Sequence, residues 1–157
     1  MTTEENFYTV LRDCRKRFVD KMPVGDVAET LVLLRQTEIE RGNVNPLLAD
    51  VVNGCVMELI RLSTMNDNTS MDVLLPRYDS VVKRSVELMM RKNHDYDEAW
   101  RLMRPTSFTD FMLVKAYRIE QIERLGGYLL ASEGTAANYE DILNYAVFYM
   151  IRNAESQ

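Results

Sequence analysis

Lys115 has the most unusual setting of any charged residue in the chain, because it lies on an otherwise apolar helical stripe. Phe111, Ile122 and Leu125 share that side of the expected helix, and Arg118 lies among them. A lysine in such a place is costly unless its ammonium reaches water or a partner. Two interpretations follow: a buried stem whose head stays in water, or a cation aimed at an anionic ligand or a carboxylate.

The segment 91–118 combines positive charge with aromatic rings. The whole chain has a net charge of −5, yet this segment has a surplus of two positive charges. Tyr96 and Trp100 are four residues apart and could share one helical face. Cations beside flat rings suit the phosphates and the base of a nucleotide. The alternative is a solvated loop with ordinary salt bridges. The charged residues are Arg91, Lys92, Asp95, Asp97, Glu98, Arg101, Arg104, Asp110, Lys115 and Arg118.

Carboxylates at helical spacing suggest a metal site. Glu120 and Glu123 lie one turn apart, and Asp141 follows eighteen positions after Glu123. Two antiparallel helices could aim these three carboxylates at one Mg²⁺, an ion that prefers oxygen ligands. The alternative is that the two glutamates belong to a solvated helix face.

Two asparagines occupy otherwise apolar helical patterns. An unpaired buried amide costs about 1–3 kcal/mol. We therefore predict that Asn53 and Asn144 each form a hydrogen bond to a neighbouring helix, and that Asn144 could also face a ligand.

The apolar spacing predicts an all-α protein. Helices are expected at about 4–22, 26–42, 46–64, 77–93, 107–126 and 137–154, and no segment shows the alternation of a strand. The polar, turn-rich segment 66–72 divides the chain.

The two parts on either side of that segment match each other. Residues 50–61 align with residues 141–152 at an offset of 91, with identical Asp, Asn, Val, Ile and Arg. Shorter ordered matches lie upstream, at an offset of 83 from Arg35 to Arg118 and at an offset of 71 from Phe7 to Tyr78. We predict a single domain, 1–157, built from a duplicated three-helix unit with pseudo-twofold packing. Residues 4–64 form a degenerate first repeat, 65–76 a linker, and 77–154 a second repeat that carries the site.

The repeats differ where chemistry is expected. The first has Val32 at the position of Lys115 and Thr37 at the position of Glu120, and its first loop is much shorter. Long loops in compact domains are often functional. We therefore expect one functional site per chain, lined mainly by the second half.

Composition narrows the function classes. The negative net charge argues against a nucleic-acid polymer as the main partner. The apolar runs are too short to span a membrane. The N-terminus lacks a signal-peptide pattern, and Cys14 and Cys55 have no paired spacing, so a cytoplasmic protein with free thiols is expected. The single histidine and the two distant cysteines do not have the spacing of a zinc site. Cys14 could act as a thiol nucleophile with His94, but no sequence pattern supports this pair.

Several separated motifs of the second half resemble the nucleotide modification associated domain 1 family. They are residues 92–101, Ser107–Asp110, Lys115 with Arg118, Ser132–Gly134 and Asn138–Tyr145. Members commonly show Asp-Tyr-Gly, a basic helix and a late Asp-x-x-Asn-Tyr; here Asp97 replaces the glycine. The resemblance implies a link to nucleotides without naming a reaction.

A fainter resemblance is to the all-helical nucleoside triphosphate pyrophosphatases, which hold Mg²⁺ with Glu-x-x-Glu and Glu-x-x-Asp. Glu120 and Glu123 fit the first motif, whereas Asn144 replaces a carboxylate of the second.

The two resemblances and the residue patterns together predict a site for a nucleotide or another phosphate ligand, with Mg²⁺-assisted hydrolysis as an open extension. The alternative is a non-catalytic helical module that binds a protein or self-associates, for example as a homodimer. The expected catalytic residues are Asp95 and Lys115; the expected ligand-binding residues are Lys92, Tyr96, Trp100, Arg101, Arg118, Asn144 and Tyr145; the expected metal ligands are Glu120, Glu123 and Asp141.

Overall fold

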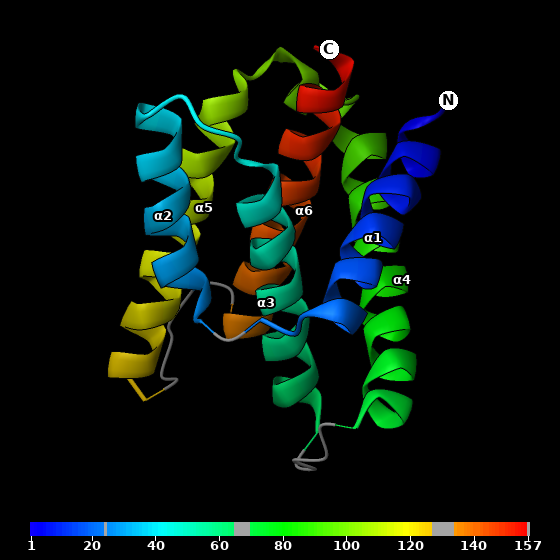
Figure 1. Cartoon of the computed structure of the whole chain (residues 1–157), viewed down its shortest axis with the longest axis vertical. Coiled ribbons are helices and arrows are strands. Elements are labelled where there is room, and N and C mark those ends of the chain that lie inside the picture. Colours follow the sequence, from blue (N-terminus) through cyan, green and yellow to red (C-terminus); the bar gives the residue numbers. More distant parts are fainter. Residues whose placement is uncertain (24, 65–69, 127–133, 157) are drawn as a thin grey trace.

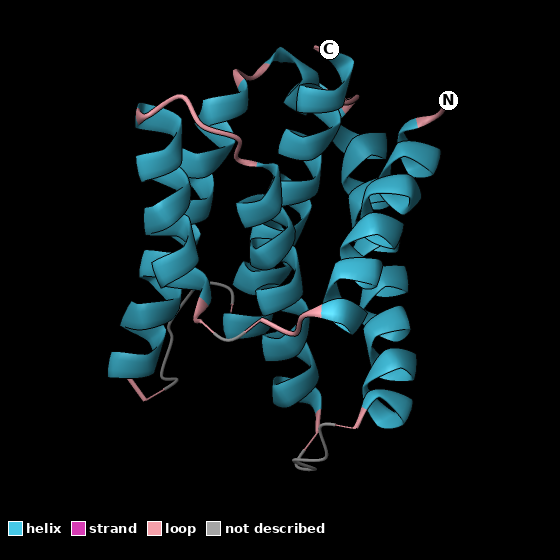
Figure 2. Ribbon diagram, in the orientation of Figure 1, coloured by secondary structure: helices cyan, strands magenta, loops and turns pink. Residues whose placement is uncertain are grey.

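The computed structural model describes residues 1–23, 25–64, 70–126 and 134–156. Within these ranges the chain forms six α-helices, one short 3₁₀ helix and no strand, which confirms the all-α prediction (Figure 2). The elements are α1 (Thr3–Asp20), α2 (Val27–Ile39), α3 (Asn45–Ser63), α4 (Met71–Tyr96), η1 (Ala99–Leu102), α5 (Pro105–Arg124) and α6 (Thr135–Glu155).

The starts of several helices have clear local causes. Thr2 caps α1 in a capping box with Glu5, and the Asp26 side chain accepts a hydrogen bond from the backbone N–H of Glu29 at the start of α2. α3 and α5 have a proline in their first turn, where a missing N–H costs nothing.

The helices lie in three side-by-side pairs, α2 with α5, α3 with α6, and α1 with α4 (Figure 1). The central pair, α3 and α6, contacts helices on both sides and carries the longest runs of buried residues. Large side chains from all parts of the described chain meet in one core, including Phe7, Leu48, Tyr78 and Phe108. Every described helix is too short or too polar to span a bilayer.

The fourth helix is longer than predicted at both ends. It begins at Met71, so residues 71–76 of the expected linker are helical; residues 65–69 lie outside the described residues. The helix continues through Pro76 because Leu74 before it and Tyr78 after it, which are one helical turn apart, are both buried in the core. A proline in the second turn removes one helical hydrogen bond, and this packing offsets the loss.

The predicted shared face of Tyr96 and Trp100 is wrong. α4 ends at Tyr96, and Asp97 and Glu98 both adopt left-handed backbone conformations, with φ of 49° and 55°. Trp100 lies beyond this turn, in η1, so the two rings belong to different elements.

Both asparagines bind a neighbouring helix, as predicted. The Asn53 side chain on α3 donates to the Cys14 carbonyl on α1 at 2.9 Å. The Asn144 side chain on α6 donates to the Ser85 carbonyl on α4 at 3.3 Å. Each bond therefore joins the third helix of one half to the first helix of the same half.

Candidate functional site

A cavity of about 790 Å³ opens between α4, η1, α5 and α6. Its lining residues come from these helices and from the segment that joins α4 to α5, which corresponds to the long loop expected in the second half. Eight of the predicted site residues line it: Lys92, Tyr96, Trp100, Lys115, Arg118, Asp141, Asn144 and Tyr145.

A carboxylate held by two ammonium groups forms the polar centre of this cavity. The Lys92 Nζ lies 2.6 Å from Asp141 Oδ1, and the Lys115 Nζ lies 2.9 Å from Asp141 Oδ2. The Asp141 side chain is only 9% exposed, whereas that of Lys115 is 20% exposed and that of Lys92 is 48% exposed. The two lysines thus satisfy a buried carboxylate while their own heads keep access to the cavity.

The cavity carries a surplus of positive charge. Lys92, Lys115 and Arg118 stand against a single carboxylate, that of Asp141. In a partly desolvated site, this imbalance favours an anion and disfavours a further cation. The position of Lys115 on its apolar stripe is therefore explained by an ion pair with Asp141, one of the two predicted alternatives.

Aromatic rings form the walls beside these charges. Trp100 is 6% exposed and stacks on Phe148, with ring centroids 4.3 Å apart and planes 19° apart. Tyr145 stacks on Phe111 with centroids at 5.5 Å, whereas Tyr96 is 69% exposed at the rim. Burial, followed by the nearby Asp141 carboxylate, raises the pKa of the Tyr145 hydroxyl, which therefore stays neutral.

The turn that carries Trp100 is held from several sides. The Arg152 Nη1 on α6 donates to the carbonyl oxygens of Arg101 at 2.8 Å and of Met103 at 2.6 Å. Arg101 binds Glu98 and Glu155 and lies over the Trp100 ring, 4.3 Å from its centroid. These contacts fix one wall of the cavity.

Two buried polar atoms of the lining residues have no hydrogen-bond partner in the described part of the chain. They are the Trp100 Nε1, a donor, and the Asn144 Oδ1, an acceptor. Unpaired buried polar atoms are rare in native proteins and often mark functional positions.

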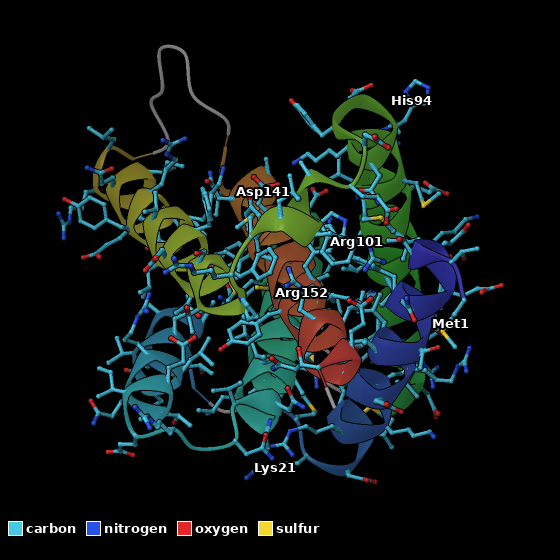
Figure 3. The ribbon with its side chains drawn as sticks, turned by 90° about the horizontal axis from the view of Figure 1, so that it is seen from above. Met1, Lys21, His94, Arg101, Asp141 and Arg152 are labelled. Atoms are coloured by element: carbon cyan, nitrogen blue, oxygen red, sulfur yellow. The ribbon has the colours of Figure 1, made fainter. Side chains whose placement is uncertain are left out.

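The structure separates four predicted residues from the cavity. Asp95 is exposed and lies 3.2 Å from the ring of His94, which Figure 3 shows at the outer edge of the molecule, away from Asp141. Arg101 does not line the cavity, because it lies over the Trp100 ring in the ion pairs described above. Glu120 and Glu123 line a different cavity together with Glu58 and Tyr139.

The proposed Mg²⁺ ligands do not meet. Glu120 pairs with Arg124 on its own helix, whereas Asp141 is already held by two lysines. Lys115 and Glu120 are five residues apart, a rotation of roughly 140° around the helix, so they point to different sides. No group of three or more potential metal-ligating side chains occurs in the described ranges. The donor set therefore does not fit the predicted metal site.

Several residues of the site have no distinctive pattern in the sequence. Met89, Asn93, Met103 and Phe148 line the cavity, and Arg152 holds its wall. Arg152 was visible only as an identity with Arg61 between the two halves. The other four had no signal beyond their place on the apolar or polar side of a helix.

Residues 92–152 match the model of the family described as nucleotide modification associated domain 1, which confirms the predicted resemblance. The matched range begins at Lys92 and ends at Arg152, so it contains most of the lining of the cavity. Searches of curated proteins and of solved structures gave no match.

Proposed function

We propose that the cavity in the second half binds a nucleotide or a closely related phosphate-bearing small molecule. The observation that carries this proposal is the pair of lysines, Lys92 and Lys115, on one buried carboxylate at the end of an aromatic-walled cavity. The family match supports the nucleotide link.

The charges suit phosphate. An ammonium has three N–H donors, and Asp141 takes one from Lys115 at 2.9 Å. The Asp141 carboxylate holds Lys92 and Lys115 on the same side of α6, so that phosphate oxygens could accept from both. Arg118 adds a guanidinium at the same cavity, suited to a bidentate contact with phosphate.

The walls suit a base. A cavity of about 790 Å³ falls within the roughly 300–1,000 Å³ range of small-molecule pockets. Tyr96 at the rim and the half-buried Tyr145 offer flat surfaces for stacking, whereas the Trp100 ring, between Phe148 and Arg101, forms a fixed wall. Trp100 Nε1 and Asn144 Oδ1 supply one donor and one acceptor among the lining residues for polar groups of a base or ribose.

The cavity is proposed as a binding site and not as a hydrolytic one. The predicted metal ligands lie in two different cavities, and the predicted catalytic Asp95 lies outside both. Lys115 is the predicted catalytic residue that remains in the cavity, where it would bind phosphate.

We also propose that the two halves arose by duplication. Asn53 and Asn144 are ninety-one positions apart, and their acceptors, Cys14 and Ser85, are seventy-one apart. These are the same offsets at which the sequences of the third and first helices align. The three helix pairs of Figure 1, α1 with α4, α2 with α5 and α3 with α6, each join corresponding helices of the two halves, which is consistent with a pseudo-twofold axis.

A thermal-shift series against nucleoside mono-, di- and triphosphates, with and without Mg²⁺, tests the proposed ligand. A nucleotide at 100 times its Kd should add about 2.7 kcal/mol to the free energy of unfolding. Lys115→Met should reduce this gain to about half or less, because a tenfold rise in Kd leaves about 1.4 kcal/mol. Lys83→Met, on an exposed part of α4, should not change it. A shift from no nucleotide, together with concentration-dependent association, would support the non-catalytic helical module instead.

A further inference from the structure

A second, smaller cavity lies between the C-terminal part of α3, the first half of α4 and the start of α6. Its volume is about 320 Å³. Ser85 lines this cavity, and Asn144, which lines the larger one, donates to the Ser85 carbonyl at 3.3 Å. The two cavities therefore lie on opposite sides of the α4–α6 contact and have no lining residue in common.

The smaller cavity has buried donors without acceptors. Arg77 Nη1 and Ser85 Oγ are both inaccessible to water, and neither has a hydrogen-bond partner in the described part of the chain. Ser85 as a whole is only 1% exposed. Buried polar groups are nearly always paired in folded proteins, so two unpaired groups at one cavity indicate an acceptor that the described part of the chain does not supply.

The charge at this cavity is also positive. Arg77 and Arg84 stand against one carboxylate, Glu140. A guanidinium presents parallel N–H donors that match the two oxygens of a carboxylate, and it stays charged at any physiological pH. An anionic group next to Arg77 would satisfy its Nη1 and would also lie within the cavity that Ser85 lines.

Most of the remaining lining is apolar, with Ser63 and Ser80 as the other polar residues. Leu59, Ile60 and Val81 line the cavity together with the ring of Pro76. A ligand that fills it must therefore combine an apolar body with one acidic head. The volume is at the small end of the range for ligand pockets, which favours a single carboxylate over a nucleotide.

We propose that this cavity is a second binding site, and that it takes a small monocarboxylate with an apolar body. The Arg77 guanidinium binds the carboxylate, the Ser85 hydroxyl donates to one of its oxygens, and Leu59, Ile60 and Val81 cover the hydrocarbon part. This site is independent of the proposed nucleotide site, because its lining residues are different.

Titration of the intact, ¹⁵N-labelled protein with 4-phenylbutyrate tests the proposal. The neutral analogue 4-phenylbutanol serves as the ligand control. We expect saturable shifts of the backbone amide signals of Leu59, Ser85 and Glu140 with the carboxylate, and at least tenfold weaker binding of the alcohol. Amide signals of Lys115 and Asp141 report separately on the larger cavity.

Two variants test whether the Arg77 and Ser85 side chains bind the carboxylate. Arg77→Met keeps the length of the side chain and removes the guanidinium, and it should weaken carboxylate binding at least tenfold. Ser85→Ala should weaken binding several-fold with the fold unchanged, because its carbonyl still accepts from Asn144. Lys83→Met, which removes one exposed cation from the same helix, should bind as the unmodified protein does.

Three results would overturn the proposal: no shift of these signals at millimolar 4-phenylbutyrate, equal binding of the alcohol, or full binding by Ser85→Ala and Arg77→Met. Should Arg77→Met not fold, Ser85→Ala and the alcohol comparison still decide the outcome.

Discussion

Asp50 in the first half and Asp141 in the second occupy matching positions, but their partners differ. Asp50 receives two parallel bonds from the single guanidinium of Arg17, at 2.8 and 3.2 Å. Asp141 receives two ammonium groups from two different helices. A forked pair satisfies both carboxylate oxygens with one side chain, whereas two separate ammonium groups gather additional positive charge around one carboxylate.

The surroundings of the two aspartates also differ, because the helices pack closely beside Asp50 and leave a cavity beside Asp141. Gly54 matches Tyr145, and a side-chain carbon on Gly54 would come within 3.0 Å of Val27 on α2. The glycine thus lets α2 pack closely on α3 in the first half. In the second half Tyr145 lines a cavity, and the inserted turn with Trp100 completes its wall. Close packing therefore fills this position in the first half, whereas the second half has a cavity there.

The largest expected difference in stability concerns the two asparagines. Asn53 makes two buried bonds, one to the Cys14 carbonyl and one from the Tyr78 hydroxyl at 2.7 Å. Asn144 makes one, at 3.3 Å. Because Asn53→Leu leaves a buried hydroxyl unpaired, it should cost about 1–3 kcal/mol more than Asn144→Leu. Urea unfolding of both variants measures this, and equal losses would contradict it.

The partner of Asn53 gives a second test of the same comparison. Tyr78→Phe should lower the free energy of unfolding by about 1–3 kcal/mol, because Asn53 Oδ1 loses its donor. The matching residue of the first helix is Phe7, and Asn144 Oδ1 has no donor in the described part of the chain. Phe7→Tyr should therefore be neutral or stabilising by up to about 1 kcal/mol. A gain in stability from Tyr78→Phe would contradict the proposed role of Tyr78 as the hydrogen-bond donor that Phe7 lacks at the matching position.

The cysteines should make the first half sensitive to alkaline pH. Burial raises the pKa of the Cys14 thiol to about 12, and burial also raises that of Cys55. Their matching residues in the second half are Ser85 and Ala146. A raised folded-state pKa gives stability that is complete below the unfolded-state pKa and falls as pH rises above it.

Measuring the free energy of unfolding at several values between pH 8 and 10 tests this loss of stability. Cys14 should contribute a loss of about 1 kcal/mol per pH unit above pH 9. The variant Cys14→Ala should show a shallower decline than the unmodified protein. A decline of unchanged slope in that variant would contradict the assignment to the thiol.

The smallest effect is expected at the turn that exists only in the second half. Asp97 has a φ of 49°, a conformation that costs a non-glycine residue up to about 1–2 kcal/mol. Asp97→Gly should therefore raise the free energy of unfolding by up to about 1 kcal/mol, as thermal unfolding can show. Destabilisation would indicate that the Asp97 side chain itself holds the turn.

Much of the fold follows from the sequence, because apolar residues at helical spacing must find a common core. Residues near Pro76 show where this fails: the polar sequence before it predicts a linker, but burial of Leu74 and Tyr78 extends the helix. The insertion between Tyr96 and Trp100 was visible as a long loop. Its left-handed turn was not, because neither Asp97 nor Glu98 is a glycine.

The site was predicted in part for a similar reason. Lys92, Asp141 and Asn144 stand out because the same residue types recur at the matching positions of the first half. Lys115 stands out because it lies on an apolar stripe where the first half has Val32, and the structure brings all four together. Glu120 and Glu123 are predicted to join them from their one-turn spacing, an assumed antiparallel helix pair and the fainter family resemblance. Spacing along one helix fixes which residues share a face, but the choice of facing helix depends on tertiary packing, which placed the two glutamates at another cavity.

Isothermal titration calorimetry tests the central claim most directly, with the nucleotide that gives the largest thermal shift as the ligand. Three proteins should be compared: the unmodified chain, Lys115→Met, and Val32→Met at the matching position of the first half. The proposal predicts one site per chain, a Kd raised at least tenfold by Lys115→Met, and no change with Val32→Met. Two equivalent sites per chain, or unchanged affinity in Lys115→Met, would contradict it.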